Sequence, residues 1–490
     1  MNRPTMKDPT TRRPLRRNVW ALLLPLALSL GGCGDSLTEV NENPNAPTDV
    51  GASFILPAAI QSAAEEALNY GMDLGVTSLW VQHIARLQYG TTDRYNLDVD
   101  FSDQSWEDFW LTAQAESREV IRRGAAAGLP NQEAVGMILR SWIFQNMTDL
   151  WGDIPYSEAL SAEAEDGTTS PAYDPQEEIY AGLIADLKAA NAMMGDGNSF
   201  GSEDLLYGGD MEGWRRFSNS LRLRLAMRLS EVDPGVAASE AASAVAGGVF
   251  TSLSHQAQLE YAESAPNQHP YHTGFVERPG DYRVSATLVD TLVALADPRL
   301  MYVAAPAESD GAYRGLPNGL PDQHEFAFNS VSKVGAWHLR ASTPSVFLST
   351  AEVLLNQAEA AQRGWIGGNP ADYYYDGITV AMEAYGIPRD QIDTYLAHPS
   401  VVYDPARALE QIGLQKWIAL YDQGVEAFAE WRRTRIPDLQ PSVANVNADR
   451  IPLRLPYPVS EQAVNNEHLQ QAVSRQGGAS INNPVWWDVP

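Results

Sequence analysis

The chain has 490 residues, with 34 basic and 62 acidic side chains and a formal net charge of −28. This acidic balance argues against a nucleic-acid partner and against adhesion to anionic lipid, because both require a basic surface. Cys33 is the one cysteine of the sequence, so disulfides cannot contribute to stability. A chain of this length can bury a large core and form two or three domains.

Residues 1–32 have the pattern of a lipoprotein signal peptide. Residues 1–17 carry six basic side chains and one acidic one, and an apolar run follows from Val19 to Leu30. That run is too short to span a bilayer as a helix. It ends in Leu30-Gly31-Gly32-Cys33, the pattern of a bacterial lipobox, whose cysteine thiol receives a diacylglycerol. We therefore predict lipidation of Cys33; the alternative is an ordinary signal peptide with a chance cysteine.

Lipidation makes Cys33 a membrane anchor. Each buried methylene contributes roughly 0.8 kcal/mol, so two or more acyl chains bind a membrane stably. Without residues 1–32 the chain keeps 28 basic and 61 acidic residues, a net charge of −33. No later stretch approaches the roughly 18 uncharged apolar residues of a membrane span. We expect a water-soluble body that contacts the membrane through its lipid alone. Arg12-Arg13 and Arg16-Arg17 leave twin-arginine export open.

Helical patterns dominate the first half of the mature chain. Residues 33–50 are polar and turn-rich and are predicted to form a lipidated tether. An N-terminal helical scaffold is expected over 51–249. The run SLRLRLAMRLS alternates like a strand, but its residues are good helix formers and its neighbours lack strand punctuation. Apolar spacing predicts helices over 53–70, 106–127, 131–147, 176–194 and 214–231.

Residues 250–345 differ from the rest, because they are rich in Gly, Pro, His and Tyr and hold few long helical patterns. We predict an irregular, loop-rich insertion, the kind of segment that usually carries binding function on a rigid scaffold. Residues 346–490 are expected to complete the same domain with helices and an extended tail. Arg432 and Arg433 are expected to complement the dipole of the last long helix. The later helices are predicted over 345–362, 369–385 and 405–433.

These patterns predict a mainly α fold, a tetratricopeptide-like scaffold of helical pairs with a long irregular insertion. Motifs of enzymes are missing from the sequence, which has no HExxH, GxSxG or GxxxxGK[ST]. His269 and His272 have a metal-ligand spacing, but they lie among prolines without a third ligand, so we interpret them as loop histidines. We predict no catalytic residue, no metal and no cofactor. Acidic residues are too abundant for a carboxylate pair to be informative, so a lipid-anchored helical glycosidase stays an alternative.

Segments along nearly the whole mature chain share one further pattern. They read VNENPNAPTDV at 40–50, MTDLWGDIPYSEAL at 147–160, WRRFSNSLRLRLAMRLS at 214–230, AEVLLNQAEAAQRGW at 351–365, RLPYPVSEQAVN at 454–465 and WWD at 486–488. In this order the segments resemble the SusD/RagB family of nutrient-binding outer-membrane lipoproteins. The resemblance implies a SusD-like fold and a binding protein, with a glycan or peptide ligand and a TonB-dependent, SusC-like barrel partner. It also implies a lipid-anchored place at the outer membrane, facing the cell exterior.

A ligand surface for a sugar needs aromatic faces and planar polar groups. The resemblance places such a surface in the early helix–loop region and in the insertion. Trp106 and Trp110 are four residues apart and are expected in the core, and Trp80 fits the core as well as the surface. A helical-repeat scaffold with protein partners alone is a further alternative. The candidate ligand-binding residues are Trp80, His83, Tyr89, Arg94, Tyr95, Asn96, Trp337 and His338.

Overall fold

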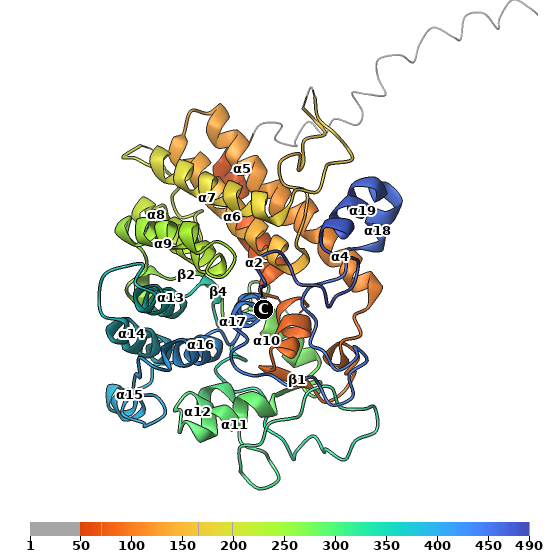
Figure 1. Ribbon diagram of the computed structural model, residues 1–490, viewed down its shortest axis with the longest axis vertical. Coiled ribbons are helices and arrows are strands. Elements are labelled where there is room, and N and C mark those ends of the chain that lie inside the picture. The colour runs from red at the N-terminus through yellow and green to blue at the C-terminus, as the bar shows by residue number, and fades with distance from the viewer. Residues whose placement is uncertain (1–49, 70, 165, 198, 490) are drawn as a thin grey trace, which may run out of the picture. The chain divides into compact units, whose positions relative to one another are not determined.

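The computed structural model describes residues 50–69, 71–164, 166–197 and 199–489. Cys33, the predicted signal peptide and residues 33–49 of the predicted tether lie outside the described residues. From Ala52 onward, one helix follows another along the first half of the chain (Figure 1). These are α2 (Ala52–Ala67), α3 (Ser78–Trp80), α4 (Val99–Asp108), α5 (Ala115–Ala126), α6 (Pro130–Trp151), α7 (Gln176–Met193), α8 (Met211–Arg228) and α9 (Pro234–Ala246), with π-helical segments at Asp73–Thr77 and Phe109–Gln114.

The second half of the chain adds a further helical group. Consecutive helices pack in pairs along the scaffold, α5 on α6, α6 on α7, α8 on α9, and α13 on α14, as Figure 1 shows. This arrangement confirms the predicted mainly α fold of helical pairs. The later helices are α13 (Thr350–Gln362), α14 (Pro370–Glu383), α15 (Arg389–Leu396), α16 (Ala408–Ala419), α17 (Gly424–Thr434), α18 (Val459–Val464) and α19 (Asn466–Arg475).

The strand-like run that begins at residue 220 is helical, as predicted, up to Arg228, where α8 ends. Asp210 caps α8 by accepting a hydrogen bond from the backbone N–H of Glu212 at 3.0 Å. The leucines of α8 are buried, and so are Arg222, Arg224 and Arg228 between them. The alternation of Leu and Arg therefore reflects a helix that is covered on several sides, where the arginines are held in ion pairs.

Buried ion pairs join the three scaffold helices α8, α13 and α17. Arg228 of α8 lies 2.6 Å from Glu426 and 3.1 Å from Glu430 of α17, and Arg224 lies 2.6 Å from Glu352 of α13. Arg433 was expected to serve the helix dipole, but it is buried and pairs with Glu359 at 2.6 Å. Arg432 is likewise buried and donates to the carbonyl oxygens of Asp149 and Leu453. Arg432 and Arg433 therefore both make their contacts inside the scaffold.

The helix predicted over 405–433 is wrong at its centre, because α16 ends at Ala419 and α17 begins at Gly424. Asp422 has a left-handed backbone with φ of 69°, which no helix can continue. The backbone N–H of Gly424 donates to Oδ1 of Asp73 at 2.8 Å, and that same oxygen accepts from the Ser78 hydroxyl at 2.7 Å. The break in the helix is therefore set by a contact with the early π-helical turn.

The insertion is held to the rest of the chain by two short antiparallel strand pairs. β1 (Ile84–Arg86) pairs with β3 (Tyr282–Val284), so that Arg86 lies opposite Tyr282. β2 (Ala257–Leu259) pairs with β4 (Ser345–Leu348) at the point where the insertion returns to the scaffold. Between these strands lie three short helices, α10 (Pro270–Glu277), α11 (Ala286–Ala294) and α12 (Leu300–Val303).

Candidate binding site

A buried carboxylate, that of Asp93, fixes the loop that follows β1. Asp93 accepts hydrogen bonds from the backbone N–H of Arg86 at 2.9 Å and from Nδ2 of Asn318 at 2.8 Å. Burial raises the pKa of Asp93 to about 6, and these donors offset part of that effect. Because Asn318 belongs to the insertion, Asp93 joins the early loop to the insertion.

An open groove lies between these two segments. We call it the Tyr89 groove; its volume is about 650 Å³. The Tyr89 ring is 69% exposed, and the Phe328 ring across the groove is 45% exposed. It is lined by residues 86–91 and Arg94 on one side and by Leu320, Pro321, Asp322, His324, Phe326 and Phe328 on the other.

Two arginine side chains that line the Tyr89 groove have partners within the chain. Arg94 pairs with Asp322 at 2.9 Å. The Arg86 guanidinium lies 4.3 Å from the centre of the Tyr282 ring and also donates to the Tyr282 hydroxyl. Tyr89 has a left-handed backbone with φ of 55°, a conformation that tyrosine rarely adopts. Such backbone strain is concentrated at functional sites, and here it accompanies an exposed aromatic side chain.

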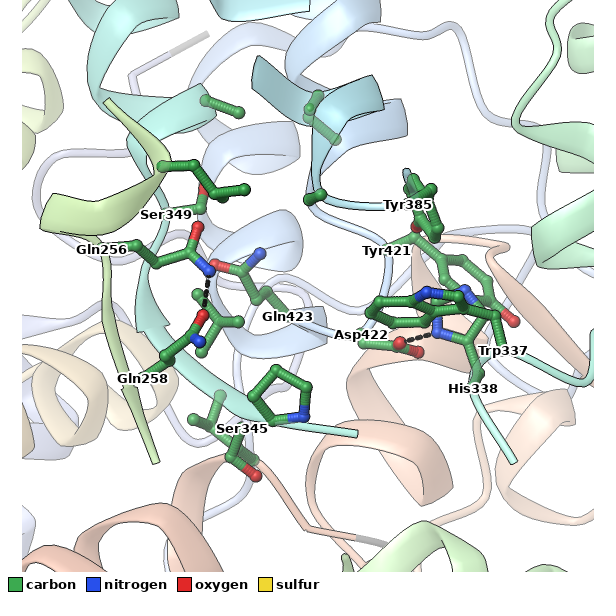
Figure 2. A pocket seen from close by; sticks show the side chains of 18 of the residues that line it. Gln256, Gln258, Trp337, His338, Ser345, Ser349, Tyr385, Tyr421, Asp422 and Gln423 are labelled. Atoms are coloured by element: carbon green, nitrogen blue, oxygen red, sulfur yellow. Dashed lines mark hydrogen bonds and ion pairs between the residues drawn. The ribbon is translucent and has the colours of Figure 1, made fainter. Parts of the chain in front are cut away.

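A second cavity, of about 300 Å³, lies where the insertion meets the ends of the scaffold helices. We call it the Trp337 pocket. Figure 2 shows Trp337 with Tyr385 and Tyr421 on one side of it, and the glutamines Gln256, Gln258 and Gln423 on the other. The three glutamines come from β2, its flanking residue and the break before α17. Its lining also includes His338, Arg340, Ser345, Ser349 and Asp422.

Three of the candidate residues lie in the core and not at either cavity. Trp80 packs edge-on against Phe428, with ring centres 5.4 Å apart. His83 hydrogen-bonds the carbonyl oxygen of Trp417 at 2.9 Å, and burial lowers its pKa to about 4. The Tyr95 hydroxyl accepts from the backbone N–H of Ser442 at 2.8 Å. The candidate ligand-binding surface therefore does not include Trp80, His83 and Tyr95, because later segments of the chain cover these side chains.

The other candidates fall into two groups. Tyr89 and Arg94 line the Tyr89 groove, and Trp337 and His338 line the Trp337 pocket. Asn96 is exposed and lines neither cavity. Trp106 is buried, as expected, and stacks on Tyr173.

Sequence reasoning missed several lining residues. Phe326 and Phe328 stand in the polar run HEFAFN at 324–329, and two aromatics in such a run are a signal that could have found them. Gln423 gave no such signal, since it was expected within a continuous helix. Gln258 belongs to β2 and Gln256 directly precedes it, and the partner strand lies almost 90 residues later in the chain.

The two loop histidines considered as metal ligands have other roles. His269 caps α10 through its Nδ1, which accepts from the backbone N–H of Tyr271 at 3.2 Å. His272 hydrogen-bonds the carbonyl oxygen of Leu339 at 2.7 Å. Within the described residues, no group of three or more His, Cys, Asp or Glu side chains could hold a metal ion. Over the same residues, no helix has both the length and the apolar character needed to cross a membrane.

The structure is a scaffold of helical pairs with a loop-rich insertion, and two ligand-sized cavities lie at that insertion. These features define the class of this protein. Over residues 44–458 the sequence matches the SusD-like family described as "starch-binding associating with outer membrane". The chain belongs to this SusD-like family, which confirms the resemblance noted in the sequence. Among curated protein sequences, none matches the chain.

Solved structures share the fold over almost the whole chain. A chitin-binding protein is 28% identical with a TM-score of 0.80, and the match covers 90% of this chain and 100% of that one. A SusD homolog from Bacteroides uniformis is 25% identical with a TM-score of 0.79, over 89% of this chain and 100% of that one. A chitin-binding SusD homolog from Flavobacterium johnsoniae is 25% identical with a TM-score of 0.77, over 89% and 98% of the two chains.

Proposed function

We propose that the protein binds an oligosaccharide in the Tyr89 groove and is a binding protein, not an enzyme. The observation that carries this proposal is the exposed Tyr89 ring, which is held on a strained backbone across from Phe328. Aromatic faces suit the apolar sides of pyranose rings, and guanidinium and amide groups suit their hydroxyls. Two structurally similar proteins are described as chitin-binding, which favours a glycan over a peptide.

The groove is tested by the affinity of the protein for soluble glycans. Maltooligosaccharides and chitooligosaccharides are titrated into the full-length protein by calorimetry. Tyr89→Ala and Phe328→Ala should each weaken binding by roughly three- to tenfold, because each removes one aromatic contact. Phe54→Ala is the matched control, since Phe54 is 77% exposed on α2 and lines neither cavity. If both groove variants bind the glycans with unchanged affinity, the proposal is contradicted.

Catalysis is tested with the same glycans. Chain lengths should stay constant after prolonged incubation with the protein. Hydrolysis that disappears when one of two facing carboxylates is changed to its amide would establish the alternative, a helical glycosidase.

We further propose that Cys33 anchors the protein in the outer membrane and that the glycan passes to a TonB-dependent, SusC-like barrel. The family description, which associates its members with the outer membrane, supports this placement. Purification of the tagged protein from outer membranes should recover a large β-barrel, and Cys33→Ala should release the protein from the membrane fraction. Recovery of a monomer without a barrel contradicts the delivery step, whereas membrane retention of Cys33→Ala contradicts the anchor.

A further inference from the structure

A third cavity lies on the N-terminal scaffold, where α4, the loop of residues 155–171 and α18 meet. We call it the Trp110 pocket; its volume is about 330 Å³. Helix α18 contacts α4 and lies beside it in Figure 1. Apolar side chains and prolines make up most of the pocket wall, and threonines and a carboxylate add polar groups. The wall includes Trp106, Trp110, Pro155, Leu160, Pro171 and Glu461.

The wall of the Trp110 pocket is held by contacts within the scaffold. The Trp110 ring is half-buried and packs edge-on against Phe144, with ring centres 5.9 Å apart. The Glu461 carboxylate accepts from the Tyr173 hydroxyl at 2.6 Å. Asn465, which follows α18, donates to a carbonyl oxygen of the loop at 2.9 Å. Because these contacts fix the wall, a bound group does not have to order it first.

The three segments around the pocket are strongly acidic. Residues 99–114, 155–171 and 459–464 together contain nine aspartates and glutamates and no lysine, arginine or histidine. Glu461 is one of these acids and lies on the pocket wall itself. A cleft surrounded by charge of one sign raises the local concentration of groups of the opposite sign. The sequence around the pocket therefore favours a cationic partner.

Apolar side chains are exposed on the same segments. Leu111, next to Trp110 in the chain, is 71% exposed, and Val464 of α18 is 70% exposed. Leu160 on the pocket wall has a left-handed backbone with φ of 55°, which a branched side chain rarely adopts. Protein interfaces combine a central pocket for an anchoring side chain with a polar rim. The Trp110 pocket, with its apolar wall and acidic surroundings, has both parts.

Charge decides which occupant fits. The predicted tether of residues 33–50 contains four acidic residues and no basic one. A second copy of the mature chain would bring a net charge of −33, and an anionic lipid surface is negative as well. Each of these would place like charges together, at a cost in binding free energy. A basic segment of another protein that carries an aromatic or branched apolar residue fits both the wall and the surrounding charge.

We propose that the Trp110 pocket is a docking site for a basic segment of a partner protein, which inserts one aromatic or branched apolar side chain and places lysines or arginines on the acidic rim. The volume lies at the lower end of the range for ligand pockets, so one side chain fits. Among the described residues, this pocket shares no lining residue with the Tyr89 groove or the Trp337 pocket. The docking site therefore does not depend on the glycan proposed for the groove.

The test is fluorescence polarisation with labelled, end-capped pentapeptides and the full-length protein. The peptide Lys-Lys-Trp-Lys-Lys should bind about tenfold more tightly than Lys-Lys-Ala-Lys-Lys, because its indole fills the pocket. It should also bind more tightly than Ser-Ser-Trp-Ser-Ser. That second difference should shrink as salt is added, since the rim acts through charge.

Two pairs of variants locate the binding. Ala162→Phe fills the pocket and should weaken binding of the lysine–tryptophan peptide by about tenfold. Ala164→Phe is the matched control, because Ala164 is exposed on the same loop and does not line the pocket. Glu461→Gln removes one charge but keeps an oxygen that can accept from Tyr173, and should weaken binding by roughly threefold. Glu383→Gln, exposed on α14, should have no effect.

Several results would overturn the docking site. These are equal binding of the tryptophan and alanine peptides, equal binding of the serine and lysine peptides that carry tryptophan, and full affinity in Ala162→Phe. Maltose or chitobiose that displaces the peptide would assign the pocket to a glycan. A dimer that Ala162→Phe dissociates would assign the pocket to a second copy. Either of these two results also overturns the proposal, whereas Tyr89→Ala, which alters the groove, should leave peptide binding intact.

Discussion

The carboxylate of Asp93 accepts a hydrogen bond from Nδ2 of Asn318 at 2.8 Å, across 225 residues of sequence. Asn318 also donates to the carbonyl oxygen of Ile84 at 2.8 Å, and its Oδ1 accepts from the Ser285 hydroxyl at 2.6 Å. All these groups are buried beneath the Tyr89 groove. One asparagine side chain therefore links three buried groups of the early loop and the insertion, in addition to the β1–β3 pairing and the Arg94–Asp322 ion pair.

Asn318→Ala is predicted to lower the free energy of unfolding by about 1–3 kcal/mol, because it leaves a buried carboxylate and a carbonyl short of donors. It should also weaken glycan binding at the groove although Tyr89 is unchanged. Denaturant titration and calorimetry measure the two effects. Asn96→Ala is the control, since Asn96 is exposed and lines neither cavity. Equal behaviour of the two variants would show that Asn318 does not hold the groove.

A second prediction concerns pH. Burial lowers the pKa of His83 to about 4, against an unfolded value of about 6.5. Between these values the unfolded chain binds the proton and the folded chain does not, so stability is lost as the pH falls. His83 should remove about 2 kcal/mol of stability between pH 7 and pH 5. In His83→Gln that loss should disappear from the pH dependence of unfolding. Parallel curves for the two proteins would rule out the lowered pKa.

A third prediction concerns the buried ion pairs. Arg228→Met leaves Glu426 and Glu430 in the core without one of their cations. Removal of one partner from a buried network should cost about 3–5 kcal/mol, measured by denaturant unfolding. Arg389→Met is the control, because the pair of Arg389 with Asp393 is exposed and should contribute less than about 1 kcal/mol. Similar losses for both variants would contradict a special role of the buried pairs.

The sequence predicted the scaffold well because amphipathic spacing is local. The helices expected over 131–147 and 176–194 are found as α6 and α7, within a few residues of the predicted ends. The helix expected over 405–433 was wrong because its break depends on Asp73 and Ser78, which lie more than 340 residues earlier. Periodicity carries no information about a contact of that range.

The binding surface was harder to predict for the same reason. Tyr89 and Trp80 are aromatics of the same early helix–loop region, yet one is 69% exposed and the other is fully buried. The difference arises from Phe428, which packs on Trp80, while no later segment covers Tyr89. Trp337 was found because it stands in an irregular run. The glutamines opposite it were not, since amides in loops are common and their convergence is set by the β2–β4 pairing.

The last prediction uses the break before α17. A Cβ at Gly424 would lie 2.2 Å from Oδ1 of Asp73 and 2.4 Å from the Ser78 hydroxyl oxygen, so these groups would have to move apart. Gly424→Ala should cost about 1–3 kcal/mol of stability through overpacking at this contact. Thermal unfolding measures the effect.

Gly367→Ala is the matched control for this change. A Cβ at Gly367 meets no atom within 4 Å, and its backbone is not left-handed, so the same substitution should leave stability within about 0.5 kcal/mol. If Gly424→Ala is as stable as Gly367→Ala, the contact with Asp73 does not set the break.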